Sequence, residues 1–173
     1  WMDFSEGHYG VSLLNDCKYG HSVREGVIGL TLIKCGVEPN PNADVEMHIF
    51  TYALYPHAGT WREARTVEES YQLNLPAYAV QGGRPGQTFS YAAVEPRNVV
   101  LETVKQAENG EGVVLRMYEC ENARTKTVVR LPEGARKAYL TNLLEEVQEE
   151  LPIVDGKVTF ITKPFEIQTL LVK

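Results

Sequence analysis

Short segments in which hydrophobic and polar residues alternate recur along most of the chain. This period of two is typical of β-strands with one buried face, because successive side chains of a strand point to opposite faces. The segments that follow it are Tyr9–Leu14, Val27–Ile33, Met47–Tyr55, Phe89–Val94, Val99–Gln106, Val113–Glu119, Thr127–Leu131, Val158–Thr162 and Glu166–Val172. Strands this numerous, separated by turn residues, predict a mainly β fold built of antiparallel β-sandwiches.

One segment departs from the alternation and predicts a single short helix. Thr60 and Glu63 have the spacing of a capping box, in which each side chain bonds the backbone N–H of the other residue. The hydrophobic residues that follow recur at helical spacing: Trp61, Ala64, Val67, Tyr71 and Leu75. Because Pro76 cannot continue a helix, we expect an amphipathic helix over about residues 60–74.

Residues 140–151 fit two patterns. Taken alone, their spacing predicts a helix with glutamates on its polar face, because one face collects Leu140, Leu143, Leu144, Val147 and Leu151. The neighbouring segments are strands, however, and this context favours a strand, which is the prediction adopted. The best boundary between domains is the Gly- and Pro-containing stretch 77–87. We therefore expect a first domain over residues 1–76, a linker over 77–87 and a second domain over 88–173.

Composition excludes several classes of protein. The 173 residues carry a net charge of −6 and scattered basic residues, which argues against a nucleic-acid partner or an anionic membrane surface. No apolar run approaches the ~20 residues needed to cross a bilayer. The chain opens at Trp1 without the features of a signal peptide, and we expect a piece of a longer polypeptide. Three widely spaced cysteines predict reduced thiols in a cytoplasmic protein.

The stretch Leu13–Ser22, LLNDCKYGHS, gathers the most reactive side chains after an apolar run. Its chemistry is incomplete as an active site, since Cys17 has no identifiable base and the chain has no G-x-S-x-G elbow. None of the four histidines has metal-binding spacing, and His48 is expected inside a strand. Glycoside hydrolysis needs two carboxylates, and only Asp16 has a suitable setting. The residues themselves predict no catalytic group and no metal site.

Three blocks, GVSLLNDCKYGHSVREGVIGLTLIKC, HIFTYALYPHAGTWREA and VTFITKPFEIQTLLVK, closely resemble the C-terminal region of glycoside hydrolase family 38 α-mannosidases, in particular the cytosolic and bacterial branch. The resemblance implies a retaining, zinc-dependent enzyme with an N-terminal (β/α) barrel that holds the zinc ion, the aspartate nucleophile and the acid/base aspartate. This chain would be the end of the large β-sandwich and the small terminal one. No segment matches the catalytic motifs, so the chain alone is predicted to be inactive, with the missing barrel as its partner and an α-mannoside as the substrate.

The same resemblance assigns roles to the stretch after Leu14. In such enzymes loops of the large sandwich approach the sugar cleft, so Asn15, Asp16, Lys18 and Tyr19 would orient sugar hydroxyls or brace the contact between domains. Two weaker candidates of the same kind are Tyr55 and His57. The alternative is an autonomous carbohydrate-binding or protein-interaction module, although such sandwiches usually display exposed aromatic platforms and the chain has only two tryptophans.

Overall fold

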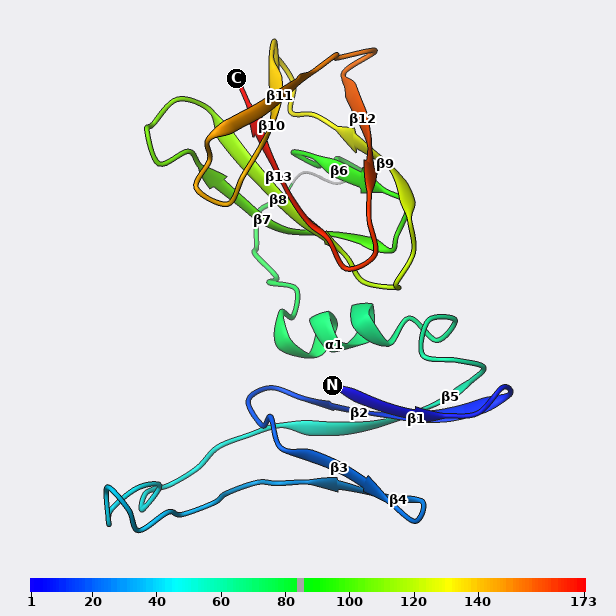
Figure 1. Ribbon diagram of the computed structural model, residues 1–173, viewed down its shortest axis with the longest axis vertical. Coiled ribbons are helices and arrows are strands. Elements are labelled where there is room, and N and C mark those ends of the chain that lie inside the picture. Colours follow the sequence, from blue (N-terminus) through cyan, green and yellow to red (C-terminus); the bar gives the residue numbers. More distant parts are fainter. Residues whose placement is uncertain (84–85) are drawn as a thin grey trace. The chain divides into compact units, whose positions relative to one another are not determined.

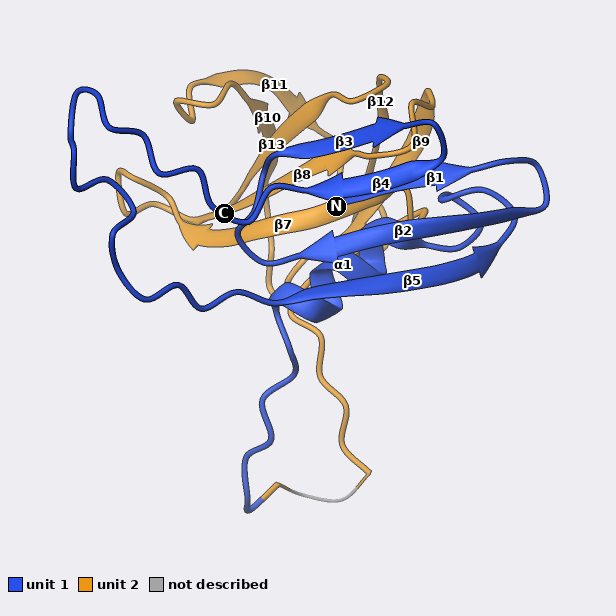
Figure 2. Ribbon diagram, turned by 90° about the horizontal axis from the view of Figure 1, so that it is seen from below, with its two compact units in different colours: residues 1–82 blue, residues 83–173 orange. Residues whose placement is uncertain are grey.

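The computed structural model describes residues 1–83 and 86–173, and the chain divides into two compact units, Trp1–Gly82 and Gly83–Lys173 (Figure 2). Over these described ranges it forms thirteen strands, paired in antiparallel sheets, and one α-helix (Figure 1). The predicted mainly β class with one short helix is therefore confirmed. The predicted linker 77–87 contains residues 84–85, which lie outside the described residues, and the predicted domain limits stay predictions.

Unit 1 contains a three-stranded sheet, a separate hairpin and the helix. The sheet has the order β1-β2-β5 and the hairpin pairs β3 with β4. Their bounds, with that of the helix, are β1 Met2–Ser5, β2 Tyr9–Asn15, β3 His21–Arg24, β4 Val27–Leu30, β5 Tyr52–Ala58 and α1 Thr66–Asn74. The hairpin turns at Glu25 and Gly26, which both have positive φ, as the two central residues of a type I′ turn require.

The helix starts later than predicted. The capping bonds between Thr60 and Glu63 are present, since the Thr60 N–H donates to Glu63 Oε2 at 2.8 Å and the Glu63 N–H to Thr60 Oγ1 at 3.5 Å. Arg65, however, takes a left-handed conformation with φ 59°, so the capped turn ends there and α1 begins at Thr66. The prediction of a helix over 60–74 is wrong at its start and correct at its end.

Unit 2 is a sandwich of a five-stranded sheet, β11-β10-β13-β8-β7, and a three-stranded sheet, β12-β9-β6. The strands are β6 Ala93–Glu95, β7 Val99–Gln106, β8 Val113–Glu119, β9 Thr125–Arg130, β10 Ala138–Thr141, β11 Val147–Leu151, β12 Lys157–Thr162 and β13 Ile167–Val172. Buried side chains from both sheets form one core, among them Leu115 and Leu170 from the larger sheet and Val129, Val158 and Phe160 from the smaller. This interleaving is what excludes water between the layers.

Residues 140–151 resolve into strand and turn. Leu140 lies in β10 opposite Leu170 of β13, and β11 follows as the next strand of the sheet. Leu143 and Leu144 occupy the turn between the two strands and are 59% and 78% exposed. The helical spacing was therefore misleading, because two of the residues that it placed on a buried face point to solvent.

Three predicted strands lose three or more of their predicted residues. The segment 47–55 becomes a strand only from Tyr52, because β5 pairs with β2 alone and β2 ends at Asn15, opposite Tyr52. The segment 27–33 ends as a strand at Leu30, and 89–94 starts at Ala93. His48 thus lies outside the strands, contrary to its predicted place. The single helix that the structure describes is too short and too polar to span a membrane.

A fully buried carboxylate organises one end of the unit 2 sandwich. Glu119 is 0% exposed and accepts hydrogen bonds from Asn98 Nδ2 at 2.9 Å, the Glu121 N–H at 2.7 Å and the Phe165 N–H at 3.0 Å. Burial raises the pKa of Glu119, but these donors outweigh it and lower the pKa overall. Backbone N–H groups of two turns, at Glu121 and Phe165, therefore stabilise the negative charge of Glu119, and the shared carboxylate links these two turns.

Candidate functional site

The residues that follow β2 form a loop whose base is fixed by Asn15. This side chain is 8% exposed, and its Oδ1 accepts the Lys18 N–H at 2.6 Å. Its Nδ2 lies 3.1 Å from His21 Nε2, while His21 Nδ1 lies 3.1 Å from the Tyr19 carbonyl oxygen. With the imidazole proton on Nδ1, both contacts are good hydrogen bonds, because Nε2 then accepts and Nδ1 donates. The Asn15 carbonyl also accepts from Asn74 Nδ2 at 3.1 Å, which anchors the loop to the end of α1.

Asp16 connects the loop to the segment that leads into β5. Its N–H donates to the Thr51 carbonyl at 3.1 Å and its Oδ2 accepts the Thr51 N–H at 2.9 Å. Hydrogen bonds from the Cys17 thiol and the Thr51 backbone lower the pKa of Asp16, and the bond to Asp16 in turn raises the pKa of Cys17. Cys17 is thus held as a thiol, which is the poor nucleophile of the two forms.

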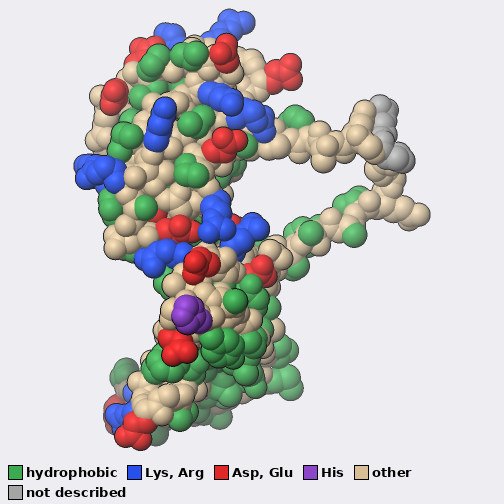
Figure 3. Space-filling model, turned by 90° about the vertical axis from the view of Figure 1, so that its right-hand side faces the viewer, with side chains coloured by type: hydrophobic (Ala, Val, Ile, Leu, Met, Phe, Trp, Pro, Cys, Tyr) green, Lys and Arg blue, Asp and Glu red, His purple; other side chains and the backbone are tan. Residues whose placement is uncertain are grey.

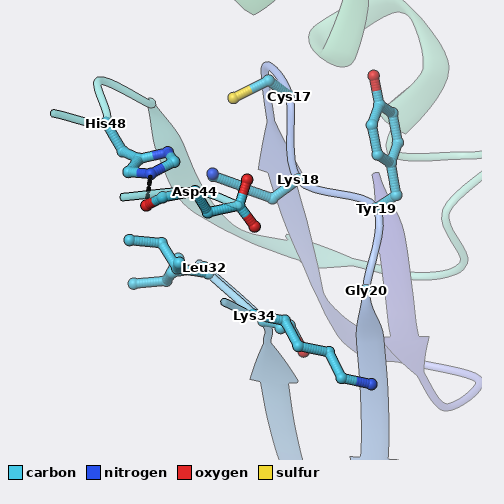
Figure 4. A pocket seen from close by; sticks show the side chains of 10 residues that line it. Cys17, Lys18, Tyr19, Gly20, Leu32, Lys34, Asp44 and His48 are labelled. Carbon is cyan, nitrogen blue, oxygen red and sulfur yellow. Dashed lines mark hydrogen bonds between the residues drawn. The ribbon is translucent and has the colours of Figure 1, made fainter. Parts of the chain in front are cut away.

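The loop forms one wall of a cavity of about 250 Å³ (Figure 4). Residues 17–20 line one side, residues 31–34 the other, and Asp44 and His48 close it. In Figure 4 the side chains of Cys17 and Lys18 point toward His48, whereas Tyr19 points away from the other labelled groups. His48 is fixed by a 2.9 Å contact between its Nε2 and the Asp44 carbonyl oxygen.

Of the charged and aromatic side chains of the loop, Lys18 has a partner within the protein, whereas Tyr19 is accessible to a ligand. The Lys18 Nζ lies 4.8 Å above the Phe50 ring, a cation–π contact that orients the ammonium group. Tyr19 is 90% exposed. The cavity lining combines the apolar side chains of Leu32 and Ile33 with one acidic group, Asp44, and two lysines, Lys18 and Lys34. Such a lining can hydrogen-bond a neutral polar ligand.

Tyr55 and His57 lie elsewhere in unit 1. Both belong to β5, with ring centres 5.7 Å apart. The Tyr55 hydroxyl donates to the Ala64 carbonyl at 3.0 Å, and His57 Nε2 lies 2.8 Å from Asp3 Oδ1. The structure therefore brings Lys18 and Tyr19 together at the cavity, sets Asn15 and Asp16 just before them in the chain and outside the cavity lining, and leaves Tyr55 and His57 in a different cluster.

This second cluster, which sequence reasoning missed, is a buried polar network centred on Asp3. Its Oδ1 accepts from Ser12 Oγ at 2.7 Å in addition to the His57 contact, and its Oδ2 accepts from Ser5 Oγ at 2.6 Å. Ser12 Oγ also lies 2.8 Å from Thr66 Oγ1, so the network reaches α1. Ser12 and Thr66 are both 0% exposed. Because each hydroxyl has a partner, the network stabilises the packing of the helix on the sheet.

The pattern that could have revealed the network is the run of small and polar residues at alternate positions of β1 and β2. In the sheet Asp3 faces Ser12, and Ser5 faces Gly10. Gly10 also faces His57, and a Cβ added there would lie 2.4 Å from His57 Cε1. The missing side chain of Gly10 is what lets the imidazole reach Asp3. Among the residues that the structure describes, no three His, Cys, Asp or Glu side chains converge as a metal site would require.

Comparison with known families matches both units. The family described as "Glycosyl hydrolases family 38 C-terminal domain" matches residues 1–42, and the "Glycosyl hydrolases family 38 C-terminal beta sandwich domain" matches residues 98–170. These ranges include the loop after β2 and most of the unit 2 sandwich.

Individual relatives align over nearly the whole chain. Alpha-mannosidase 2C1 of Homo sapiens is 38% identical over 99% of this chain, and Alpha-mannosidase G of Dictyostelium discoideum is 33% identical over 98%. The chain spans only 17% and 16% of these proteins. A crystal structure of an alpha-mannosidase from Enterococcus faecalis V583 has the same fold, with a TM-score of 0.76 at 22% identity, covering 99% of this chain and 20% of that one.

Proposed function

The chain belongs to glycosyl hydrolase family 38, as part of its C-terminal region, and from this premise we propose that it is the non-catalytic end of an α-mannosidase. In the complete enzyme it would support the fold and form part of the rim of the sugar cleft. The observation that carries the proposal is the match of both units to C-terminal family 38 domains within relatives named as α-mannosidases. The substrate would be an α-linked mannoside.

The end of β2 and the loop after it support a division of roles among their residues. Asn15 is buried and engaged on every side, which suits a brace that sets the shape of the loop. Asp16 is exposed although it is bonded to Thr51, so one carboxylate edge can still accept from a sugar hydroxyl. Lys18 and Tyr19 line the cavity and would supply the remaining donors. Tyr55 and His57 would act indirectly, through the packing of α1.

Catalysis itself would reside outside this chain. A retaining glycosidase needs two carboxyl groups about 5–5.5 Å apart. Asp16 is the only acid among the residues predicted for the site, and it bonds to Thr51 and Cys17, while Asp44 is the acid that lines the cavity. The described residues do not converge as a metal site, so they do not fit a zinc ion. As the resemblance to family 38 α-mannosidases implies, the nucleophile, the acid/base group and the zinc ion would lie in a (β/α) barrel of the same polypeptide.

Exposed hydrophobic side chains support the presence of further domains of the same polypeptide that would pack against unit 1. In unit 1 Leu54 is 66% exposed, Phe4 47%, and Met47 and Ile49 are each 87% exposed. Figure 3 shows hydrophobic side chains gathered on one face of the same unit, in the lower part of the picture. Extended apolar patches on soluble proteins mark interaction surfaces, and the missing barrel and the rest of the large sandwich would cover this one.

Cys17 and Cys35 are free and exposed, and free exposed thiols favour a location in the reducing cytoplasm.

The experiment is a comparison of variants in the longer enzyme that includes the upstream catalytic region. We expect Asp16→Asn and Lys18→Met to lower kcat/KM for an aryl α-mannoside while the melting temperature stays near that of the parent. Glu46→Gln, which removes an exposed charge of the same unit, serves as the control and should change neither. If Asp16→Asn lowers the yield of folded enzyme as much as its activity, the residue is a brace between domains and has no part in the cleft.

A further inference from the structure

A second cavity, within unit 2, opens between the segment 88–91 and the end of β9. Its volume of about 460 Å³ falls in the range of roughly 300–1,000 Å³ that is typical of small-molecule sites. The residues that line it are Thr88, Phe89, Ser90, Tyr91, Arg130 and Glu133. We call it the 88–91 pocket. Neither the candidate residues of the loop after β2 nor the buried network around Asp3 contributes to it.

Two aromatic rings give the pocket its apolar surface. Phe89 is 84% exposed and Tyr91 is 41% exposed, and the two are separated by one residue. Aromatic rings are large apolar surfaces that are usually buried, so two of them in one open pocket point to a ligand with a flat apolar face. A pyranose ring has such a face, because its axial C–H groups project to one side while its hydroxyls project outward.

Two charged groups supply the polar part of the lining. Arg130 Nη2 donates to the Ser90 carbonyl at 3.2 Å, which fixes the guanidinium group and ties the segment 88–91 to β9. A guanidinium has five N–H donors, so others remain for a ligand. Glu133, which is exposed in the turn after β9, contributes acceptor oxygens. A hydroxyl both donates and accepts, and this pairing of a donor group with an acceptor group suits it.

The charge of the pocket decides between ligand classes. One cationic and one anionic side chain cancel, so the lining carries no net charge to attract a phosphate or a nucleotide. A neutral polyhydroxylated ring satisfies the aromatic faces, the donors and the acceptors together. We propose that the 88–91 pocket is a carbohydrate-binding site of the terminal sandwich. The carbohydrate class follows from the lining, and the choice of a mannoside rests on the proposed function.

The test is a titration of the ¹⁵N-labelled 173-residue chain with methyl α-D-mannopyranoside, followed by amide chemical shifts. Saturable shifts are expected at Phe89, Tyr91 and Arg130. Phe89→Ala and Tyr91→Ala should each weaken binding by about tenfold, since each removes one ring face. Phe165→Ala removes a ring of unit 2 that is 61% exposed and does not line the pocket, and it should leave the affinity unchanged.

Three results would overturn the proposal: no saturable shifts, shifts that persist at full strength in both pocket variants, or shifts confined to residues 15–20. Unchanged amide signals in the rest of unit 2 verify that each variant is folded, which is expected because Phe89 is exposed and Tyr91 partly so. A longer enzyme that failed to cleave α-mannosides would contradict the proposed function and leave a positive titration standing. The two proposals can therefore fail separately.

Discussion

Gly10 is the position at which the smallest possible substitution should most disturb unit 1. It lies in β2, opposite Ser5 on one side and His57 on the other. A Cβ built there would lie 2.4 Å from Ser5 Cβ, 2.4 Å from His57 Cε1 and 2.8 Å from His57 Nε2, well inside van der Waals contact. In Gly10→Ala the imidazole must therefore move away from Asp3.

The cost has two sources. Forcing one methyl group into a packed site typically costs about 1–3 kcal/mol. Losing the 2.8 Å hydrogen bond between His57 and the Asp3 carboxylate, whose side chains are 3% and 4% exposed, costs about 1.5–3 kcal/mol. Because movement of the ring relieves part of the clash, the two do not add in full. We expect Gly10→Ala to lower the free energy of unfolding of unit 1 by about 2–4 kcal/mol.

Denaturation in guanidinium chloride, followed by tryptophan fluorescence, measures this loss. Both tryptophans, Trp1 and Trp61, lie in unit 1 with ring centres 5.3 Å apart, so the signal reports that unit. Gly7→Ala is the matched control, because a Cβ at Gly7 meets nothing within 4 Å. It should change the free energy by less than about 1 kcal/mol. Equal midpoints for the two variants would refute the steric argument.

Three further predictions concern ionisable groups. Burial raises the pKa of Asp3, but hydrogen bonds from two serines and a histidine outweigh it and lower the pKa below its ordinary value of 3.8. The contribution of Asp3 to stability is therefore full above that value and is lost as the pH falls through the folded-state pKa. In the fluorescence assay, Asp3→Asn should reduce the loss of unfolding free energy that occurs at acid pH. Glu119→Gln should destabilise unit 2 by about 1–3 kcal/mol, because the amide nitrogen of the glutamine would face a backbone N–H donor. Urea denaturation of unit 2, followed by its amide signals, measures this loss, and an unchanged urea midpoint would count against it. Burial raises the pKa of Cys120 to about 11, so iodoacetamide should label Cys120 after Cys17, and mass spectrometry that found the reverse order would contradict this. Because the hydrogen bond to Asp16 raises the pKa of Cys17, Asp16→Asn should speed the labelling of Cys17, and an unchanged rate would contradict that role of Asp16.

Strands with a clear alternation that are joined by a short hairpin loop were predictable from sequence. The bounds predicted for β7 and β8, Val99–Gln106 and Val113–Glu119, match the structure, since both strands alternate and a short glycine-containing loop joins them. Predictions from local sequence patterns failed where the bounds of a strand depend on pairing with a distant segment. Residues 47–51 have the composition of a strand, but β2 ends before it can pair with them. The capping box formed as expected, yet the left-handed conformation of Arg65 delayed the helix.

The candidate site was predictable only as far as its residues are neighbours in sequence. Asn15, Asp16 and Lys18 form one polar run, and the structure places them at the last residue of β2 and in the loop that follows it. Asp3 and His57 are separated by 54 residues, and no local pattern links them. Their contact depends on the order of three strands and on the missing side chain at Gly10, and single-sequence reasoning had determined neither.

The measurement that tests the central claim most directly is hydrolysis of an aryl α-mannoside by the purified 173-residue chain, with and without added Zn²⁺, beside the longer polypeptide that contains the upstream region. We predict no turnover by the chain alone under either condition, and turnover by the longer polypeptide. Hydrolysis by the isolated chain, abolished by a substitution within it, would contradict the claim that the catalytic groups lie elsewhere.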